Sequence, residues 1–152
     1  MLASYDTEAA YKLLENEEIP GWLSMPKNGA TTIWENWDGP FNTQGAGLGS
    51  LNHYSKGAVI EWLFKVMCGI RVDGENHFIV APQPGGHFTR AEAGYTSVFG
   101  RIESCWEREL DEAGKAVKTI YTVTVPANCT ADIHLPGGME KTVGAGEHQF
   151  RE

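Results

Sequence analysis

The stretch NHYSKGAVIEWLFKVMCGIRVDGENHFIV, residues 52–80, contains the change of periodicity that decides the fold. Its first apolar residues recur at helical spacing, the pattern of an amphipathic helix; they are Val59, Trp62, Leu63, Val66, Met67 and Ile70. Gly69 can end this helix. After Asp73 the pattern becomes short runs of β-forming residues between turns. The sequence therefore predicts a helical part over residues 1–72 and a β part over residues 73–152.

The β part contains six predicted strands joined by turn-forming residues. Asp111–Gly114 and Pro136–Gly138 have the composition of hairpin connections. The pattern predicts a small antiparallel β-sandwich, and with the helical part it gives an α+β fold. The predicted strands span residues 77–80, 89–95, 99–109, 117–125, 130–135 and 142–150.

In the helical part, the sequence predicts one further helix over residues 7–17. Its N-cap is expected at Asp6 or Thr7, and its end before Pro20. Residues 20–51 are rich in Gly, Pro, Asn and Trp, which predicts long irregular loops of the kind that carry function. Two helices have no partner for their apolar faces except the sandwich, whereas such helices normally pack in hairpins. We therefore expect further helices upstream.

The composition limits the partners. The formal charge of -8 over 152 residues repels phosphate groups, so nucleic acid and anionic membranes are poor partners and a neutral sugar fits better. Residues 1–6 have no basic start or apolar core, and no stretch reaches the roughly 20 apolar residues of a membrane span. The expected location is the cytoplasm, although a longer parent protein could carry a secretion signal upstream.

The Cys and His residues do not predict a metal site or a cofactor. Cys68, Cys105 and Cys129 lie far apart without C-x-x-C spacing, so they are interpreted as buried thiols. The histidines after residue 73 stand singly, without ligand spacing.

Five motifs occur in an order and spacing that resemble the end of the catalytic domain and the adjoining β-domain of bacterial α-L-rhamnosidases. They are TIWENWDG (32–39), SLNHY (50–54), GAVIEWL (57–63), Gly69-Ile70 and PQPGG (82–86). The resemblance covers nearly the whole chain. It implies that residues 1–72 are the last portion of a barrel of six helical hairpins, an (α/α)6 barrel.

The resemblance implies an inverting glycoside hydrolase with Glu35 as its general base. Such an enzyme pairs a carboxylate that deprotonates water with an acid that protonates the leaving oxygen. No motif in this chain matches the family's general acid, so the chain alone is expected to be inactive. Judged without the resemblance, Glu35 would be interpreted as a solvated or paired surface residue. Asp38 is interpreted as a turn residue, and Glu61 as the partner of Lys65 in a surface ion pair.

Three further residues are candidates for binding rhamnose, and the resemblance implies that one of them, His53, lies at a position that contacts the sugar. Trp34 and Trp37 flank Glu35, and indole faces suit the apolar face of a 6-deoxy sugar, but both could equally be core residues. His53 could hold a sugar hydroxyl through a ring N–H, or it could be a capping or buried histidine. The N-cap of the following helix is expected at Asn52 or Ser55.

The sequence thus supports three functions. The first is a fragment of an enzyme that removes terminal α-linked L-rhamnose from glycosides or polysaccharides. The second is a non-catalytic carbohydrate-binding module, and the third is an interaction domain that docks on another subunit. Because the predicted helices leave apolar surface uncovered, we also expect a homo-oligomer.

Overall fold

The computed structural model describes residues 6–41 and 49–152. By their contacts the residues form two compact units, Met1–Glu61 and Trp62–Glu152. Within the described ranges, no helix is both long and apolar enough to cross a membrane. The domain boundary expected after residue 72 stays a prediction.

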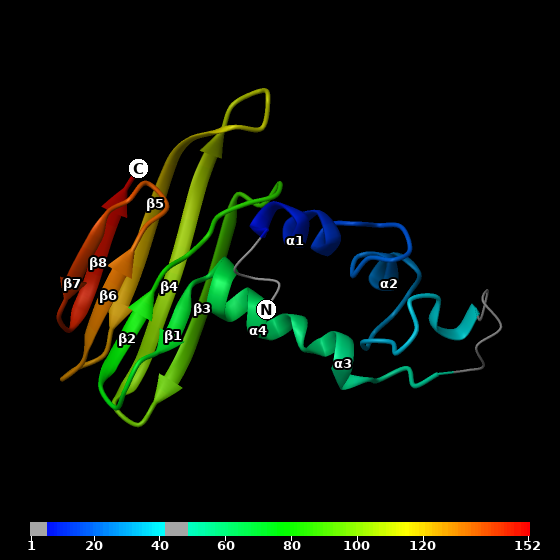
Figure 1. Cartoon of the computed structure of the whole chain (residues 1–152), viewed down its shortest axis with the longest axis horizontal. Helices are drawn as coiled ribbons and strands as arrows, with labels where there is room; N and C mark the ends of the chain where they lie inside the picture. The colour runs from blue at the N-terminus through cyan, green and yellow to red at the C-terminus, as the bar shows by residue number, and fades with distance from the viewer. Residues whose placement is uncertain (1–5, 42–48) are drawn as a thin grey trace. The chain divides into compact units, whose positions relative to one another are not determined.

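The first unit consists of short helices joined by loops (Figure 1). Helix α1 has Asp6 as its N-cap, as predicted, and the Asp6 carboxylate accepts a hydrogen bond from the Ala9 amide at 2.8 Å. The helix ends at Leu14, three residues before its predicted end. The other helices of this unit lie in segments predicted as loop or as one long helix. The helices are α1 (Thr7–Leu14), α2 (Ser24–Lys27), the 3-10 helix η2 (Gly39–Phe41), α3 (Tyr54–Gly57) and α4 (Val59–Trp62), the last of which runs into the second unit.

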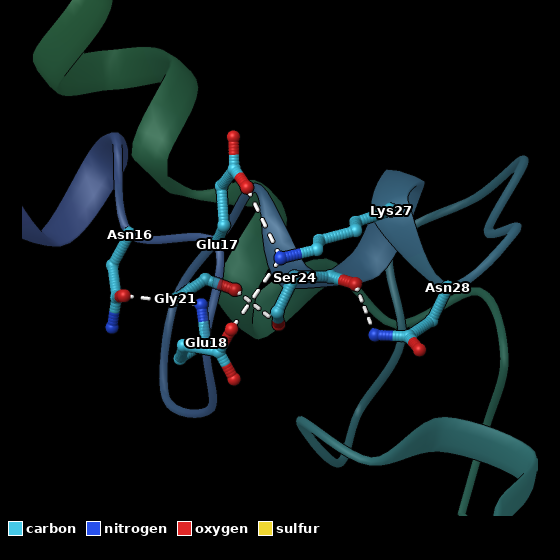
Figure 2. Close-up of polar contacts among 7 residues, drawn as sticks. All are labelled: Asn16, Glu17, Glu18, Gly21, Ser24, Lys27 and Asn28. Atoms are coloured by element: carbon cyan, nitrogen blue, oxygen red, sulfur yellow. Dashed lines mark hydrogen bonds and ion pairs between the residues drawn. The ribbon is translucent and has the colours of Figure 1, made fainter.

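Local polar contacts explain the early end of α1 (Figure 2). The side chain of Asn16 accepts a hydrogen bond from the Glu18 amide at 3.1 Å, which replaces helical bonding. Lys27 Nζ lies 3.1 Å from a carboxylate oxygen of Glu17. Gly21 is required in this turn, because a Cβ there would lie 2.2 Å from the carbonyl oxygen of Asn16. The chain therefore turns back before the helix can reach residue 17.

The predicted end of the long helix at Gly69 is confirmed, whereas its prediction as one regular helix is wrong. The chain forms α3, α4 and then a π-helix, η3 (Leu63–Met67), before Ile70 begins strand β1. Gly69 gives the physical reason: it has a φ of 77°, and a Cβ there would lie 2.2 Å from the carbonyl carbon of Ala81. The helix must end where these two backbones approach, and Ile70 joins a sheet instead.

The second unit is a β-sandwich of two four-stranded sheets, with orders β1-β2-β6-β7 and β3-β4-β5-β8 (Figure 1). The sandwich is confirmed, and both predicted hairpin turns connect neighbouring strands. The strands are β1 (Ile70–Val72), β2 (His77–Val80), β3 (Arg90–Ser97), β4 (Gly100–Leu110), β5 (Ala116–Val125), β6 (Thr130–His134), β7 (Glu140–Val143) and β8 (Gly146–Arg151).

Three details of the predicted sandwich are wrong. Strand β2 pairs with β6 in parallel, so the sandwich is not wholly antiparallel. The predicted strand 142–150 is two strands in different sheets, separated by Gly144 and Ala145, and Gly146, which has a φ of 123°, begins the second strand. Strand β1 lies within the part predicted as helical, where no strand was expected. Each error arises from a tertiary pairing that local periodicity does not specify.

The core lies between the two sheets, where alternate side chains of β2, β4, β5 and β6 are buried. Its fully buried members include Phe78, Val80, Ile102, Trp106, Val123 and Ile133. Cys68 and Cys129 are buried free thiols, as predicted, whereas Cys105 is only half-buried. Burial raises the pKa of the Cys68 thiol to about 11, so this side chain stays a neutral, unreactive group.

Strand β4 anchors the segment that leaves η3. The indole N–H of Trp106 donates to the carbonyl oxygen of Met67 at 2.8 Å, and the Ser104 hydroxyl donates to that of Cys68 at 2.7 Å. The Gln83 amide donates to the Val66 carbonyl at 2.9 Å. Because a buried carbonyl without a donor costs about 1–3 kcal/mol, these bonds fix the path of the chain into β1.

A chain of side-chain hydrogen bonds crosses β2, β6 and β7. His77 Nδ1 lies 2.7 Å from the Thr130 hydroxyl oxygen, and His77 Nε2 lies 3.2 Å from Asp132 Oδ2. Thr142 donates to Asp132 Oδ1 at 2.6 Å. The Thr142 hydrogen bond, followed by that of His77, lowers the pKa of Asp132 below its usual value.

We predict that Asp132 contributes to acid sensitivity. A carboxyl whose pKa is lower in the folded state stabilises the fold above its unfolded pKa of about 3.9, and this contribution is lost as the pH falls through the folded pKa. Urea unfolding between about pH 5 and pH 2 should therefore show a smaller loss of stability in Asp132→Asn than in the wild type. Glu112→Gln, on the exposed turn after β4, should behave like the wild type. Equal acid sensitivity of all three proteins would contradict the prediction.

Candidate functional site

Two segments of the first unit pair through their backbones and place Glu35. The Glu35 amide donates to the Ser50 carbonyl at 2.8 Å, and the His53 amide donates to the Ile33 carbonyl at 2.8 Å. The Ser50 amide in turn donates to Glu35 Oε2 at 2.7 Å. The carboxylate is therefore held by one oxygen while its side chain remains 43% exposed. A held, accessible carboxylate of this kind can accept a proton from a bound water.

His53 lies beside this carboxylate and begins helix α3. Its Nδ1 accepts from the Ser55 amide at 3.3 Å and lies 2.8 Å from the Ser55 hydroxyl oxygen. The predicted N-cap at Asn52 or Ser55 is therefore wrong, because the His53 side chain caps this helix. With Nδ1 as the acceptor, the neutral ring carries its proton on Nε2, which lies 3.9 Å from Glu35 Oε1. A donor and an acceptor thus border the same space.

Trp37 is held by Lys56 and Trp22. The Lys56 ammonium lies 4.6 Å from the centre of the Trp37 ring and donates to the carbonyl oxygen of Glu35. The Trp22 ring packs edge-on against Trp37 at 5.2 Å, and its indole N–H donates to the Lys56 carbonyl at 3.0 Å. Lys56 therefore links the loop that carries Glu35 and Trp37, called the base loop below, to α3. It does so by a hydrogen bond and by a cation–π contact.

Trp34 is a core residue of the first unit, with 5% of its surface exposed. Its ring lies 6.2 Å from that of Phe41 at a steep angle. Gly39 is required beside it, because a Cβ at that position would lie 2.2 Å from the indole. The contacts of Trp34 and Trp37 with a sugar stay predictions, and this packing gives both indoles a structural role.

The remaining acidic candidate of this loop, Asp38, is buried with 8% exposure, and its carbonyl oxygen accepts from the Phe41 amide at 3.0 Å. Residues 6–41 and 49–152 contain no group of three or more His, Cys, Asp or Glu side chains that could hold a metal ion. Compared with the buried Asp38, the 43% exposed Glu35 side chain has surroundings that suit a base.

Sequence reasoning missed Lys56 and Ser50. Lys56 lies 21 residues from Glu35, and Ser50 acts through its backbone amide rather than its side chain. Neither contact leaves a signal in local composition, because both arise from the pairing of distant segments. The one available signal was their position, since Ser50 begins the motif SLNHY and Lys56 lies directly before GAVIEWL.

Two family models match the chain. Residues 1–67 match the bacterial alpha-L-rhamnosidase 6 hairpin glycosidase domain, and residues 71–150 match the bacterial alpha-L-rhamnosidase C-terminal domain. The second match alone covers more than half of the chain. The chain belongs to the bacterial α-L-rhamnosidase family.

Relatives in this family cover nearly the whole chain. This chain is 33% identical to an alpha-L-rhamnosidase of Streptomyces avermitilis, over 86% of the residues of this chain. It is also 33% identical to one of Formosa agariphila, over 95% of the residues of this chain. An alpha-L-rhamnosidase of Alteromonas sp. (strain LOR) is 34% identical over 86%. The chain spans only 12–16% of the length of these three relatives.

Solved rhamnosidase structures have the same fold as this chain. The rhamnosidase of Aspergillus terreus superposes with a TM-score of 0.81 at 28% identity, over 95% of this chain and 17% of that one. The alpha-L-rhamnosidase of Dictyoglumus thermophilum gives a TM-score of 0.79 at 26% identity, over 95% and 18%. These matches confirm the rhamnosidase fold predicted from the five motifs.

We predict that Lys56→Met loosens the base loop. It removes a charged hydrogen bond to Glu35 and the contact with Trp37, which together should lower the local opening free energy by about 1–2 kcal/mol. Hydrogen exchange at the Glu35 and His53 amides should then accelerate roughly 5–30-fold. Lys27→Met, which removes exposed ion pairs, should leave both rates unchanged. Unchanged exchange in Lys56→Met would contradict the linking role.

Proposed function

We propose that the chain is the carboxy-terminal part of an α-L-rhamnosidase that hydrolyses terminal α-L-rhamnosyl linkages with inversion. The observation that carries the proposal is the geometry of Glu35, whose Oε2 accepts the Ser50 amide at 2.7 Å while Oε1 faces His53 Nε2. A general base requires a carboxylate that is held in place and open to water, and the Ser50 hydrogen bond and the exposure of Glu35 meet both requirements. The membership of the family supplies the reaction class.

The proposed step is a single displacement. Glu35 Oε1 accepts a proton from a water as the water oxygen forms a bond to the anomeric carbon. The bond between that carbon and the leaving oxygen breaks on the opposite face, where a general acid from outside this chain donates a proton. The two carboxyl groups of such a pair lie roughly 6.5–9.5 Å apart, with the water beside the base.

His53 is proposed to donate from Nε2 to a hydroxyl of the rhamnosyl unit. Its Nδ1 is already occupied in capping α3, which fixes the ring and leaves the second nitrogen directed at the space beside Glu35. Trp34 and Trp37 are proposed to hold this loop and to border the sugar. The proposed substrates are rhamnose-containing glycosides or polysaccharides.

Glu35→Gln tests the base role in a full-length α-L-rhamnosidase that contains this chain. Gln keeps the shape but cannot accept a proton, so kcat should fall on the order of 10²–10⁴-fold with little change in substrate affinity. Azide, which attacks without losing a proton, should partly restore turnover of an activated aryl rhamnoside and give a product of inverted configuration. The 152-residue chain alone, without the acid, should show no measurable turnover of the same substrate.

Glu61→Gln provides the matched control and should retain kcat, because this residue is predicted to form a surface ion pair. An unaltered kcat in Glu35→Gln would remove Glu35 from the base role. Turnover by the isolated chain that is lost in Glu35→Gln would instead mean that this part contains a sufficient catalytic centre.

Self-association of the chain is the second part of the proposal. Phe41 and Ile60 of the first unit are 58% and 53% exposed, and apolar surface of this kind favours association. A two-fold dimer would need only one self-complementary surface.

Light scattering over a range of concentrations should give a mass that rises toward that of a dimer. Ile60→Glu should shift the protein toward monomer, because it places a charge in the interface. Val117→Glu, at a position of similar exposure on β5, should leave the dimer intact. A strictly monomeric wild type at high concentration would refute the homo-oligomer.

A further inference from the structure

Tyr54 is the most exposed aromatic residue close to the candidate base, with 86% of its surface accessible. Its ring stacks on that of His53, with centroids 5.2 Å apart and planes within 15° of parallel. His53 itself lies 3.9 Å from Glu35. An open aromatic face is therefore connected to the carboxylate through a single intervening ring.

The indoles beside Glu35 are already engaged. Trp34 is buried against Phe41, while Trp37 contacts the Lys56 ammonium and the edge of Trp22. Tyr54, by contrast, uses one face on His53 and leaves the rest of its ring open. An exposed aromatic ring beside polar groups is suited to contact with the apolar face of a ligand.

We propose that Tyr54 binds the apolar side of the rhamnosyl unit and selects for its C6 methyl group; this inference rests on the proposed function. In an inverting reaction the base stands on the face opposite the leaving group, so a ring next to the base contacts the sugar that is released rather than the leaving group. A methyl group at C6 packs against an aromatic ring. A hydroxymethyl group instead places a hydroxyl against the ring, where the hydroxyl gains no hydrogen bond.

The experiment compares two probes, methyl α-L-rhamnoside and methyl α-L-mannoside, which differ at C6 by methyl against hydroxymethyl. Binding to the full chain is measured by saturation transfer from aromatic protons, with the His53 ring signals recorded in the same titrations. The wild type should bind the rhamnoside about tenfold more tightly. Saturation should be strongest at the C6 methyl group.

Tyr54→Ala should abolish this preference and the methyl saturation, while Tyr54→Phe, which keeps the ring, should retain both. Tyr95→Ala, which removes an exposed tyrosine from β3, is the matched control and should bind like the wild type. Undiminished preference in Tyr54→Ala, with the rhamnoside still shifting the His53 signals, would overturn the role of Tyr54 and leave the proposed site intact. If the rhamnoside shifts no His53 signal and receives no saturation, both the role of Tyr54 and the proposed rhamnose site are overturned.

Discussion

The candidate site depends on the backbone pairing of residues 33–35 with residues 50–53. Two main-chain hydrogen bonds of 2.8 Å join these segments. Because the same pairing aims the Ser50 amide at Glu35 Oε2, one local structure sets both the position of the carboxylate and its hydrogen bond. It also brings His53 beside a base that lies 18 residues earlier in the chain. Without this pairing, the loop residues would have no fixed relation to one another.

Lys56 and His53 extend this order from the loop into helix α3. His53 caps the helix with one ring nitrogen, and Lys56, on the same turn, contacts the Glu35 carbonyl and the Trp37 ring. A helix of four residues has little stability of its own. The contacts of His53 and Lys56 therefore stabilise α3, and α3 in turn holds these two side chains in place. Precise placement of a catalytic group requires this kind of mutual support.

The sequence was informative where local rules apply and where whole motifs could be compared. Runs of β-forming residues on either side of Asp111–Gly114 predicted β4, β5 and the turn between them. The helical stripe includes Ile70, but Ile70 begins β1, because the chain turns at Gly69 beside the backbone of Ala81. In the candidate site, the motifs pointed to Glu35 and His53, but the contacts of Lys56 and Ser50 arise only from tertiary pairing. The cap of α3 was misplaced because His53 competes successfully with more usual capping residues.

The parallel pairing of β2 with β6 has a consequence for the order in which the sandwich can fold. His77 and Thr130 are partners in this ladder and lie 53 residues apart in sequence, whereas β3, β4 and β5 are joined by short connections. Pairings between distant segments form slowly, since a long loop must close before any contact compensates for its lost entropy. The β3–β4–β5 meander can therefore form first and provide the surface on which β2 and β6 meet. A growing chain that has not yet reached residue 130 has a β1–β2 hairpin without β6 and a strand β5 without β8, and both open edges are exposed to mispairing during synthesis.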